Sequence, residues 1–340
     1  MRFEAIKLEF TSPLHIGRGW GDLDRSEPIL HSDSLKSAIY FSLIQLFPEW
    51  KSEEKALEFF NGFVISSCFP YYNNEFFLPK LPIRNFIISG IDDYKIAKVA
   101  KKIEYLSLDV FKNYLNSKEI INIDKKQLSE NGKYVFANNN APINFIRSQT
   151  QQRITIKNTG KSIPFFVDRL FFMKNSGLYF LADFKKNDQL KFLVFKALKF
   201  LGTIGIGTDK TVGNGFFEFD ENRHVQEILI ETKNTYTNDY AYASLGLFIP
   251  TEEEFKRINF DKSFWNIKER GGYIAGSEYI KFRHLLKKSI YMFTEGSIFF
   301  TETLKENLEG KLVNLKPDWN DNDMHNVYRC GKSIFIKVNL

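Results

Sequence analysis

The segment Gly202-Thr203-Ile204-Gly205-Ile206-Gly207-Thr208-Asp209-Lys210-Thr211-Val212-Gly213-Asn214-Gly215 joins an amphipathic helix to a short apolar strand. Its glycines permit positive φ angles and let another stretch of backbone approach closely. Lys210 and Thr211 add a cation and a hydroxyl, which are groups that contact phosphate. The segment is therefore a candidate phosphate-binding loop, although a plain connection from helix to strand would also use glycine.

The elements before this loop follow from their hydrophobic patterns. A helix with a buried leucine- and valine-rich stripe leads into the loop; Asp188 is its expected N-cap and Gly202 its expected end. Before that helix, residues 163–173 and 178–184 have the composition of strands. The Asn and Gly in the short connection between them predict a hairpin of these two strands.

The N-terminal elements complete the pattern. Ile6, Leu8 and Phe10 alternate with polar residues, as in a half-buried strand, and the sequence His31-Ser32-Asp33-Ser34 opens a helix with Ser32 or Asp33 as its N-cap. Over the first 220 residues the order is strand-helix-strand, a long insertion, strand-strand-helix, glycine loop and strand. This split βαβ order predicts an α+β, ferredoxin-like domain.

A second domain is expected after residue 223. Strands recur in this part of the chain, and Thr251 with Glu254 forms the signature of a capping box at the start of a helix. The prediction is one domain over 1–223, with an insertion at about 75–162, and a strand-rich domain over 224–340.

A long acid-free run gives the clearest sign of a partner. Residues 131–167 contain no Asp or Glu, but they are rich in amides, hydroxyls and basic residues. Such a segment suits a polyanion, because Arg and Lys contact phosphates while Asn, Gln, Ser and Thr bond to sugars. A solvated mobile loop is the alternative. Together with the glycine loop, this run predicts binding of single-stranded nucleic acid, and of RNA in particular.

Composition excludes several other classes. The 340 residues are 43% hydrophobic and 26% charged with a net charge of +6, which is typical of a globular chain rather than a disordered one. No apolar run is long enough to span a membrane, and two distant cysteines suit a reducing cytoplasm. Walker A, Rossmann and helical zinc-site patterns all fail, so no cofactor or metal is expected.

Several further segments, spread over the whole chain, narrow the assignment. They are Leu14-His15-Ile16-Gly17, Ile29-Leu30-His31-Ser32-Asp33-Ser34-Leu35, Leu245-Gly246-Leu247-Phe248-Ile249-Pro250-Thr251, Arg270-Gly271-Gly272-Tyr273, Met292-Phe293-Thr294-Glu295-Gly296-Ser297 and Val327-Tyr328-Arg329-Cys330-Gly331. The glycine loop resembles that of the RAMP superfamily of CRISPR systems. With these segments in this order, the chain resembles the fourth-subunit family of the Csm complex, the type III-A CRISPR effector.

The resemblance implies two ferredoxin-like (RRM-like) domains and a non-catalytic, RNA-binding role in antiviral defence. Members of the family hold the repeat-derived 5′ tag of the CRISPR RNA and link the large polymerase/nuclease subunit to the backbone subunits. Carried over, the insertion would supply a projecting hairpin and basic groove, and His31 to Ser34 would lie beside the RNA. The expected RNA-binding residues are His15, Arg18, His31, Ser32, Arg147, Arg153, Lys157, Lys161, Gly205, Gly207, Thr208, Lys210, Thr211, Gly213, Asn214 and Gly215. Asp209 beside Lys210 departs from the more basic loops of the family and is expected to pair locally.

Two other functions remain open. Some relatives cut precursor CRISPR RNA or target RNA, and here His31 as general base or Asp33 as the acidic group would do so. A protein-interaction module is the third possibility. Its surface would use the aromatic residues Trp265, Tyr273, Tyr279, Phe282, Tyr291 and Phe293.

Overall fold

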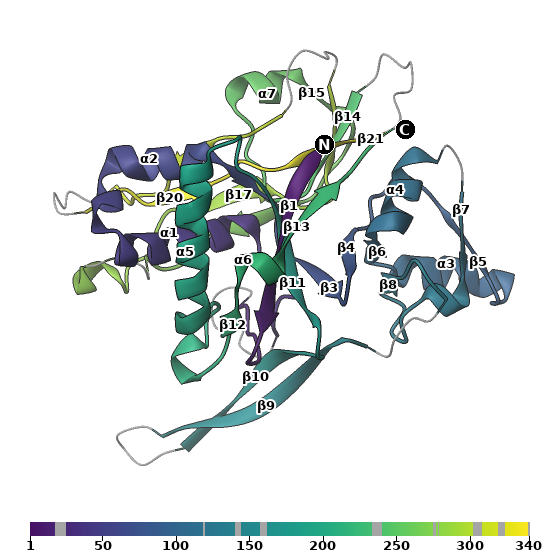
Figure 1. The fold of residues 1–340 in the computed structure, drawn as a ribbon, viewed down its shortest axis with the longest axis horizontal. Helices are drawn as coiled ribbons and strands as arrows, with labels where there is room; N and C mark the ends of the chain where they lie inside the picture. Colours follow the sequence, from purple (N-terminus) through teal and green to yellow (C-terminus); the bar gives the residue numbers. More distant parts are fainter. Residues whose placement is uncertain are drawn as a thin grey trace.

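A nine-stranded sheet forms the centre of the first two thirds of the chain (Figure 1). The computed structural model describes residues 1–17, 25–117, 120–139, 144–156, 162–232, 240–274, 277, 279–301, 308–318 and 324–338. The strand order is β12-β1-β11-β3-β4-β6-β8, and β13 also pairs with β1 and β2 with β11. The strands are β1 Arg2–Phe10, β2 Val64–Ile65, β3 Phe69–Tyr72, β4 Glu75–Pro79, β6 Tyr105–Ser107, β8 Tyr134–Val135, β11 Ser176–Asp183, β12 Phe217–Glu218 and β13 Val225–Leu229.

Three helices cover one face of this sheet: α1 (Ser32–Leu46), α2 (Glu53–Gly62) and α5 (Asp188–Ile204). Ile6 and Leu8 of β1 are fully buried beneath them, which confirms the predicted alternation. On the opposite face, Phe3 and Ala5 are buried in a second core cluster, and Lys7 and Glu9 are half-buried. Short turns and helices complete this region: η1 Pro48–Lys51, η3 Lys210–Val212 and α6 Glu221–His224.

The helix boundaries differ from the sequence prediction in three places. Helix α1 already includes Ser32 and Asp33, so neither is its N-cap; His31 occupies that position without a side-chain cap. Asn187, rather than Asp188, caps α5 by accepting from the N–H of Leu190. Gly202 lies inside α5, where its missing side chain admits the carbonyl of Phe217, and Gly205 ends the helix with φ of 80°.

The predicted insertion is folded and extends the sheet through β4, β6 and β8. It also contains a parallel pair, β5 (Phe86–Ser89) with β7 (Ile121–Asp124). Helix α3 (Asp93–Lys102) exposes its lysines. The remaining elements of the insertion are α4 Leu108–Asn116 and η2 Lys125–Gln127.

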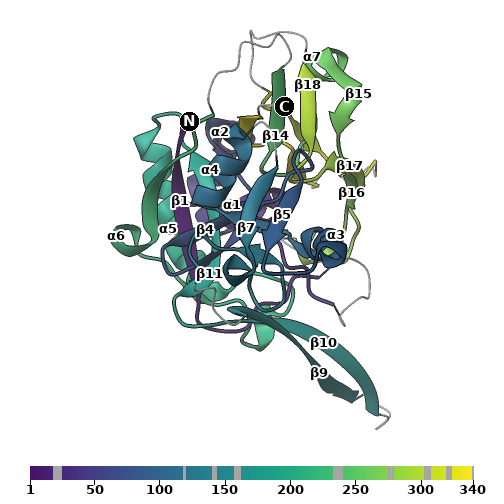
Figure 2. The same ribbon diagram turned by 90° about the vertical axis from the view of Figure 1, so that its right-hand side faces the viewer.

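A long hairpin, β9 (Ile146–Ile156) with β10 (Ser162–Phe172), projects from the body (Figures 1 and 2). Every residue of β10 is paired with one of β9, so the predicted hairpin of β10 with β11 is wrong. Strand β11 pairs instead with β1, β2 and β3 inside the sheet. The partner was missed because β9 is polar and acid-free, without the apolar alternation that marks a half-buried strand.

The C-terminal part contains a four-stranded sheet in the order β15-β18-β14-β21 and two smaller strand pairs. Helix α7 (Glu252–Arg257) begins with the predicted capping box of Thr251 and Glu254. One hydrophobic cluster contains residues of both sheets, including Tyr179 and Ile336. The elements are β14 Tyr240–Ser244, β15 Ile258–Phe264, β16 Ile267–Arg270, η4 Ile280–Phe282, β17 Ile290–Phe293, β18 Ile298–Thr301, β19 Leu312–Asn314, β20 Tyr328–Cys330 and β21 Phe335–Val338.

Strand β13 follows residue 223, yet it pairs with β1 in the first sheet rather than with the second. A domain boundary near residue 223 would therefore separate β13 from the sheet to which it belongs. Within the described residues, none of the helices is both long enough and apolar enough to cross a membrane.

Candidate nucleic-acid interface

The glycine loop is held tightly against the exit of β1. The N–H of Thr208 donates to the carbonyl of His15 (3.1 Å), and the N–H of Gly215 donates to that of Pro13 (2.7 Å). A Cβ on Gly207 would lie 2.4 Å from the His15 oxygen, and one on Gly215 would lie 1.8 Å from the Ile206 oxygen. These glycines therefore serve close backbone packing.

The projecting hairpin meets the glycine loop at Asp209. Arg169 of β10 pairs with the Asp209 carboxylate at 2.7 Å, and Arg153 of β9 approaches the same oxygen at 3.4 Å. Asn214 donates to this oxygen at 3.2 Å. We call these four residues the hairpin–loop junction. Asp209 therefore bonds locally to Asn214, as expected. Its main partners, however, are the distant Arg153 and Arg169, which connect the hairpin to the glycine loop.

The exposed members of the expected RNA-binding set belong to both segments that meet at this junction, β9 and the glycine loop. Arg147, Thr208, Thr211 and Gly213 are exposed, whereas Arg153, Gly207 and Lys210 are half-buried. The Lys210 amine lies 5.6 Å above the ring of Phe41 in α1.

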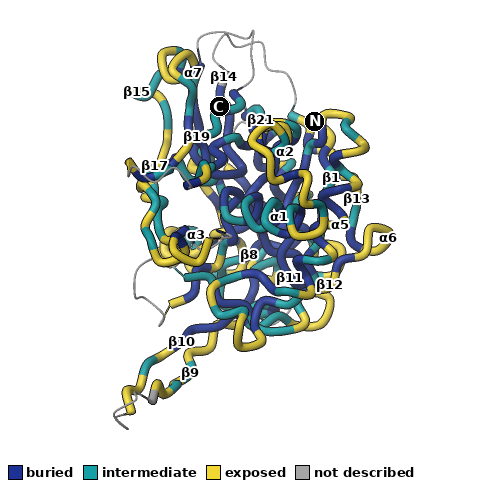
Figure 3. Tube along the Cα trace, turned by 90° about the vertical axis from the view of Figure 1, so that its left-hand side faces the viewer, coloured by how far each residue is buried: buried dark blue, intermediate teal, exposed yellow. Residues whose placement is uncertain are grey.

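The outer half of the hairpin is exposed on both of its faces (Figure 3). It presents Ile154 (60% exposed) and Phe166 (52% exposed) beside polar side chains. The surface therefore combines cations, hydroxyls, amides and apolar rings, which are the groups that contact single-stranded RNA.

Other members of the set are inside the protein. His15, His31, Ser32, Asn214, Gly205 and Gly215 are buried. The His15 Nδ1 atom bonds to the carbonyl of Asp168 (2.6 Å), and Ser32 bonds to Ser67 and to the N–H of Leu247. These residues can position the surface but are covered by protein. Arg18, Lys157 and Lys161 lie outside the described residues.

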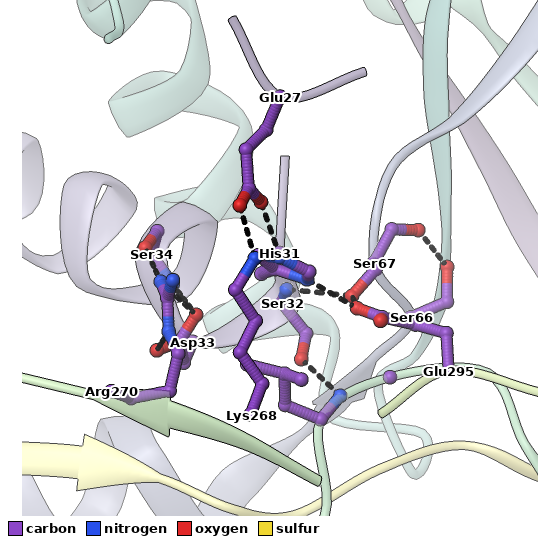
Figure 4. Close-up of polar contacts among 12 residues, drawn as sticks. Glu27, His31, Ser32, Asp33, Ser34, Ser66, Ser67, Lys268, Arg270 and Glu295 are labelled. Carbon is purple, nitrogen blue, oxygen red and sulfur yellow. Dashed lines mark hydrogen bonds and ion pairs between the residues drawn. The ribbon is translucent and has the colours of Figure 1, made fainter. Parts of the chain in front are cut away.

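His31 is the centre of a buried polar cluster (Figure 4). Its Nδ1 is 2.7 Å from the Glu295 carboxylate and its Nε2 is 2.8 Å from that of Glu27. Lys268 also pairs with Glu27, and Ser67 bonds to Glu295. Burial alone would lower the pKa of His31, but the carboxylates of Glu295 and Glu27 outweigh it and raise this pKa to about 9. The imidazole is therefore a cation at neutral pH.

Asp33, two residues after His31, forms a second buried cluster at the start of α1. Arg270 grips its carboxylate in a bidentate pair at 3.0 and 3.1 Å and also donates to Ser34 (Figure 4). Arg329 of β20 pairs with the same carboxylate. Asp33 is fully buried, yet the two guanidinium groups overcome the effect of burial and hold its pKa far below the ordinary value.

These two clusters have the chemistry of fixed ion pairs. Both ring nitrogens of His31 face carboxylates, which leaves no lone pair for a general base. Asp33 stays ionised between its arginines and has no proton to give. Neither group reaches a surface where a scissile phosphate could lie, because both are under 6% exposed. In the part of the chain that the structure describes, no group of three or more His, Cys, Asp or Glu residues could hold a metal.

The partners of these clusters come from segments that carry the sequence resemblance. Arg270, Glu295 and Arg329 belong to three C-terminal segments that converge on the start of α1. Sequence spacing could not identify these three residues as partners of His31 and Asp33, because each of them lies more than 200 residues away from the residue it pairs with. Arg169 was missed for a similar reason: its role depends on the pairing of β10 with β9.

Four of the six aromatic residues considered for protein contacts lie at the surface. Trp265, Tyr273, Tyr279 and Tyr291 are between 44% and 63% exposed. Phe282 is buried and Phe293 is half-buried between other rings.

Known proteins with similar sequences point to one family. Residues 237–338 match the CRISPR Csm4 C-terminal domain. The CRISPR system Cms protein Csm4 of Methanocaldococcus jannaschii is 27% identical over an alignment that covers 100% of this chain and 98% of that protein. The corresponding protein of Thermococcus onnurineus is 25% identical over 81% of this chain and 82% of its own length.

Solved structures share the fold. A chain of the Csm3–Csm4 subcomplex of the type III-A CRISPR–Cas interference complex superposes with a TM-score of 0.64 at 21% identity, with full coverage of both chains. A chain of the Csm1–Csm4 cassette in complex with pppApA gives a TM-score of 0.58 at 20% identity, covering 100% of this chain and 99% of that one. The RAMP superfamily model matches residues 7–218, more than half of the sequence. The chain therefore belongs to the RAMP superfamily, and the residues that follow the RAMP match correspond to the C-terminal domain of Csm4.

Proposed function

We propose that this chain is the Csm4-type subunit of a type III-A CRISPR effector complex and binds the 5′ repeat-derived tag of the CRISPR RNA without cutting it. The Csm4 relatives and the Csm3–Csm4 and Csm1–Csm4 assemblies support a place in such a complex. The chain would link the large polymerase/nuclease subunit to the backbone subunits in the cytoplasm. Two free, buried cysteines suit that reducing compartment.

The hairpin–loop junction carries the proposal for RNA. It joins the amide-rich, acid-free strand β9 to the glycine loop through Asp209, which brings polar groups of the two segments together. Arg147 of β9 and Thr211 of the glycine loop are exposed, and their side chains can contact phosphate and sugar. The exposed ring of Phe166 on the hairpin would stack with an unpaired base.

A scaffold rather than a nuclease is proposed because of the ion pairs of His31 and Asp33. A cutting site needs a base that can accept a proton near the scissile phosphate. Here both ring nitrogens of His31 are occupied, and Asp33 is enclosed by Arg270 and Arg329. The finer assignment, two ferredoxin-like domains, is supported for the first domain by the antiparallel order β12-β1-β11-β3.

The test is a salt-series binding assay with tag RNA and a scrambled RNA of equal length. We expect the wild-type chain to prefer the tag and to lose affinity as salt rises, because bound phosphates release counterions. Arg147→Ala/Arg153→Ala should weaken binding and lower the slope of log K against log salt by about 1 for each lost phosphate contact. The matched control is Lys98→Ala/Lys101→Ala on the exposed face of α3.

The same samples decide between scaffold and nuclease. Incubation with labelled precursor RNA should give no products from wild type, His31→Ala or Asp33→Ala. Cleavage that disappears in either variant while the fold persists would overturn the scaffold proposal. Equal loss of binding in the α3 control would show that general charge, and not the hairpin, binds the RNA.

A further inference from the structure

We propose that the cavity between α1, α2 and the C-terminal residues 273–274, 277, 279, 287 and 325–328 is a nucleotide-binding pocket. In it a nucleobase would lie against the rings of Phe41, Tyr279 and Tyr328, and the phosphate would lie at Lys287. The shared chemistry is that of a ribonucleotide. It could be a free mononucleotide or one nucleotide of a bound RNA strand, and only in the second case does this proposal rest on the proposed function.

The cavity has the size and position of a ligand site. Its volume is about 390 Å³, within the range of roughly 300–1,000 Å³ that is common for small-molecule pockets. Its walls come from both halves of the sequence, because α1 and α2 lie beside β20 (Figure 1). Such junctions between structural units are frequent places for binding sites.

Aromatic rings line two sides of this cavity. Phe41 on α1 is half-buried, and Tyr279 is 49% exposed and packs edge-on against Phe282. Tyr328 is half-buried and held by a 2.7 Å hydrogen bond from its hydroxyl to Glu53. Rings that are partly exposed and fixed by neighbours offer faces on which a planar base can stack.

Polar groups with spare bonding capacity stand between these rings. The Ser277 hydroxyl and His325 are joined at 2.9 Å, and the backbone oxygen of Asn326 accepts from the other ring nitrogen of His325. The Ser277 hydroxyl also accepts from the N–H of Tyr279 at 3.2 Å, so this hydroxyl and the backbone oxygen of Asn326 each keep one bonding position for the edge of a base. Aromatic walls with a few such groups favour a nucleobase over a purely aliphatic ligand.

The charge on the inner side of the cavity favours an anion. Lys287 lines the cavity, and burial together with the nearby cation Arg329 lowers its pKa to about 7. Arg270 and Arg329 share the single carboxylate of Asp33, and the Nε of Arg329, itself 5% exposed, has no partner among the described residues. A phosphate at Lys287 would offset this excess of positive charge.

One wall of the cavity also lies beside the glycine loop. Phe41 lines the cavity, and the same ring carries the Lys210 amine above it at 5.6 Å. A strand bound along the loop would thus pass Lys210 close to the entrance. This position is the reason to include an RNA nucleotide as a source of the ligand.

The test measures mononucleotides and RNA on the full chain. Calorimetric titrations use AMP, GMP, CMP and UMP, the four matching nucleosides, and tag RNA. The pocket variants are Lys287→Gln and Tyr279→Ala. Their matched controls are Lys288→Gln, an exposed neighbour paired with Asp318, and Tyr291→Ala, 63% exposed and outside the cavity. Circular dichroism checks that each variant is folded.

Binding of a mononucleotide that weakens at least about tenfold in Tyr279→Ala and Lys287→Gln, but not in the controls, supports the pocket with a free nucleotide. Lys287→Gln should leave nucleoside affinity nearly unchanged. If mononucleotides fail to bind but RNA affinity falls in the pocket variants alone, the pocket holds a nucleotide of the strand. Unchanged binding of every ligand in folded pocket variants overturns this proposal. The proposed function would still stand if RNA binding then depended on Arg147 and Arg153, and it would fail by itself if only mononucleotides bound.

Discussion

At the residue scale, His31 shows how protonation enters the stability of the fold. Its pKa in the folded chain is about 9, compared with an ordinary value of 6.5. The folded state therefore binds the proton more tightly, so the stabilisation is complete below about pH 6.5 and is lost as pH rises through about 9. The effect is on the order of 3 kcal/mol.

We therefore expect the stability advantage of wild type over His31→Gln to shrink between pH 6.5 and pH 9. Urea unfolding at several pH values measures the difference. Comparing wild type with His31→Gln is necessary because Lys287 also titrates over an overlapping pH range. Its pKa is lowered to about 7, so its contribution to the free energy of unfolding rises with pH, whereas that of His31 falls. An advantage that stays constant with pH would contradict the charged state assigned to His31.

Asp33 makes a second prediction at this scale. Asp33→Asn removes the carboxylate and leaves Arg270 and Arg329 as buried cations without their shared partner. Breaking a buried pair in this way costs about 3–5 kcal/mol. Asp92→Asn, in an exposed pair with Lys95, is the matched control and should change the free energy of unfolding by less than about 1 kcal/mol. Similar small changes in both variants would mean that the buried pair contributes little.

At the scale of the element, two glycines of the loop allow the cost of a steric clash to be distinguished from the cost of backbone strain. Gly215 and Gly213 both have positive φ, at 75° and 89°, but only Gly215 lies against backbone, with the Ile206 oxygen 1.8 Å from an added Cβ. Around Gly213 nothing lies within 4 Å of the added Cβ.

Gly213→Ala should therefore cost only about 1–2 kcal/mol, the strain of a left-handed residue. Gly215→Ala should cost clearly more, because the loop must move away from Ile206. Thermal unfolding of both variants measures this. If Gly215→Ala destabilised the chain no more than Gly213→Ala, the close packing of the loop against its own backbone would be refuted.

At the scale of the whole molecule, the two sheets share one core. A single cluster includes Tyr179 of the first sheet and Ile336 of the second. The N–H of Ser67 donates to the carbonyl of Leu245 at 2.8 Å, and the N–H of Leu247 donates to the Ser32 hydroxyl at 3.0 Å. The two parts predicted from sequence are thus joined by apolar packing, hydrogen bonds and buried ion pairs.

This sharing predicts one cooperative transition in calorimetry of the intact chain. It also predicts that a fragment of residues 1–232 fails to fold, because its side of the core would be exposed to water. Two separate transitions, or a fragment with a native-like circular dichroism spectrum and cooperative melting, would show that the units are independent.

The sequence by itself determined what depends on near neighbours. The alternation of Ile6 and Leu8, the capping box of Thr251 and Glu254, and the helix before the glycine loop were predictable because their partners lie within a few residues. The glycine loop and the acid-free run could be singled out from composition, whereas their joint role in RNA binding stays a prediction.

Only the tertiary structure decided which strand pairs with β10 and which groups surround His31 and Asp33. Sequence reasoning treated Ser32 or Asp33 as a helix cap, since a local role explains those residues without distant partners. Their real environment is made by Glu295, Arg270 and Arg329, brought from the far end of the chain by folding. Long-range partners of this kind follow from packing, and no local pattern encodes them.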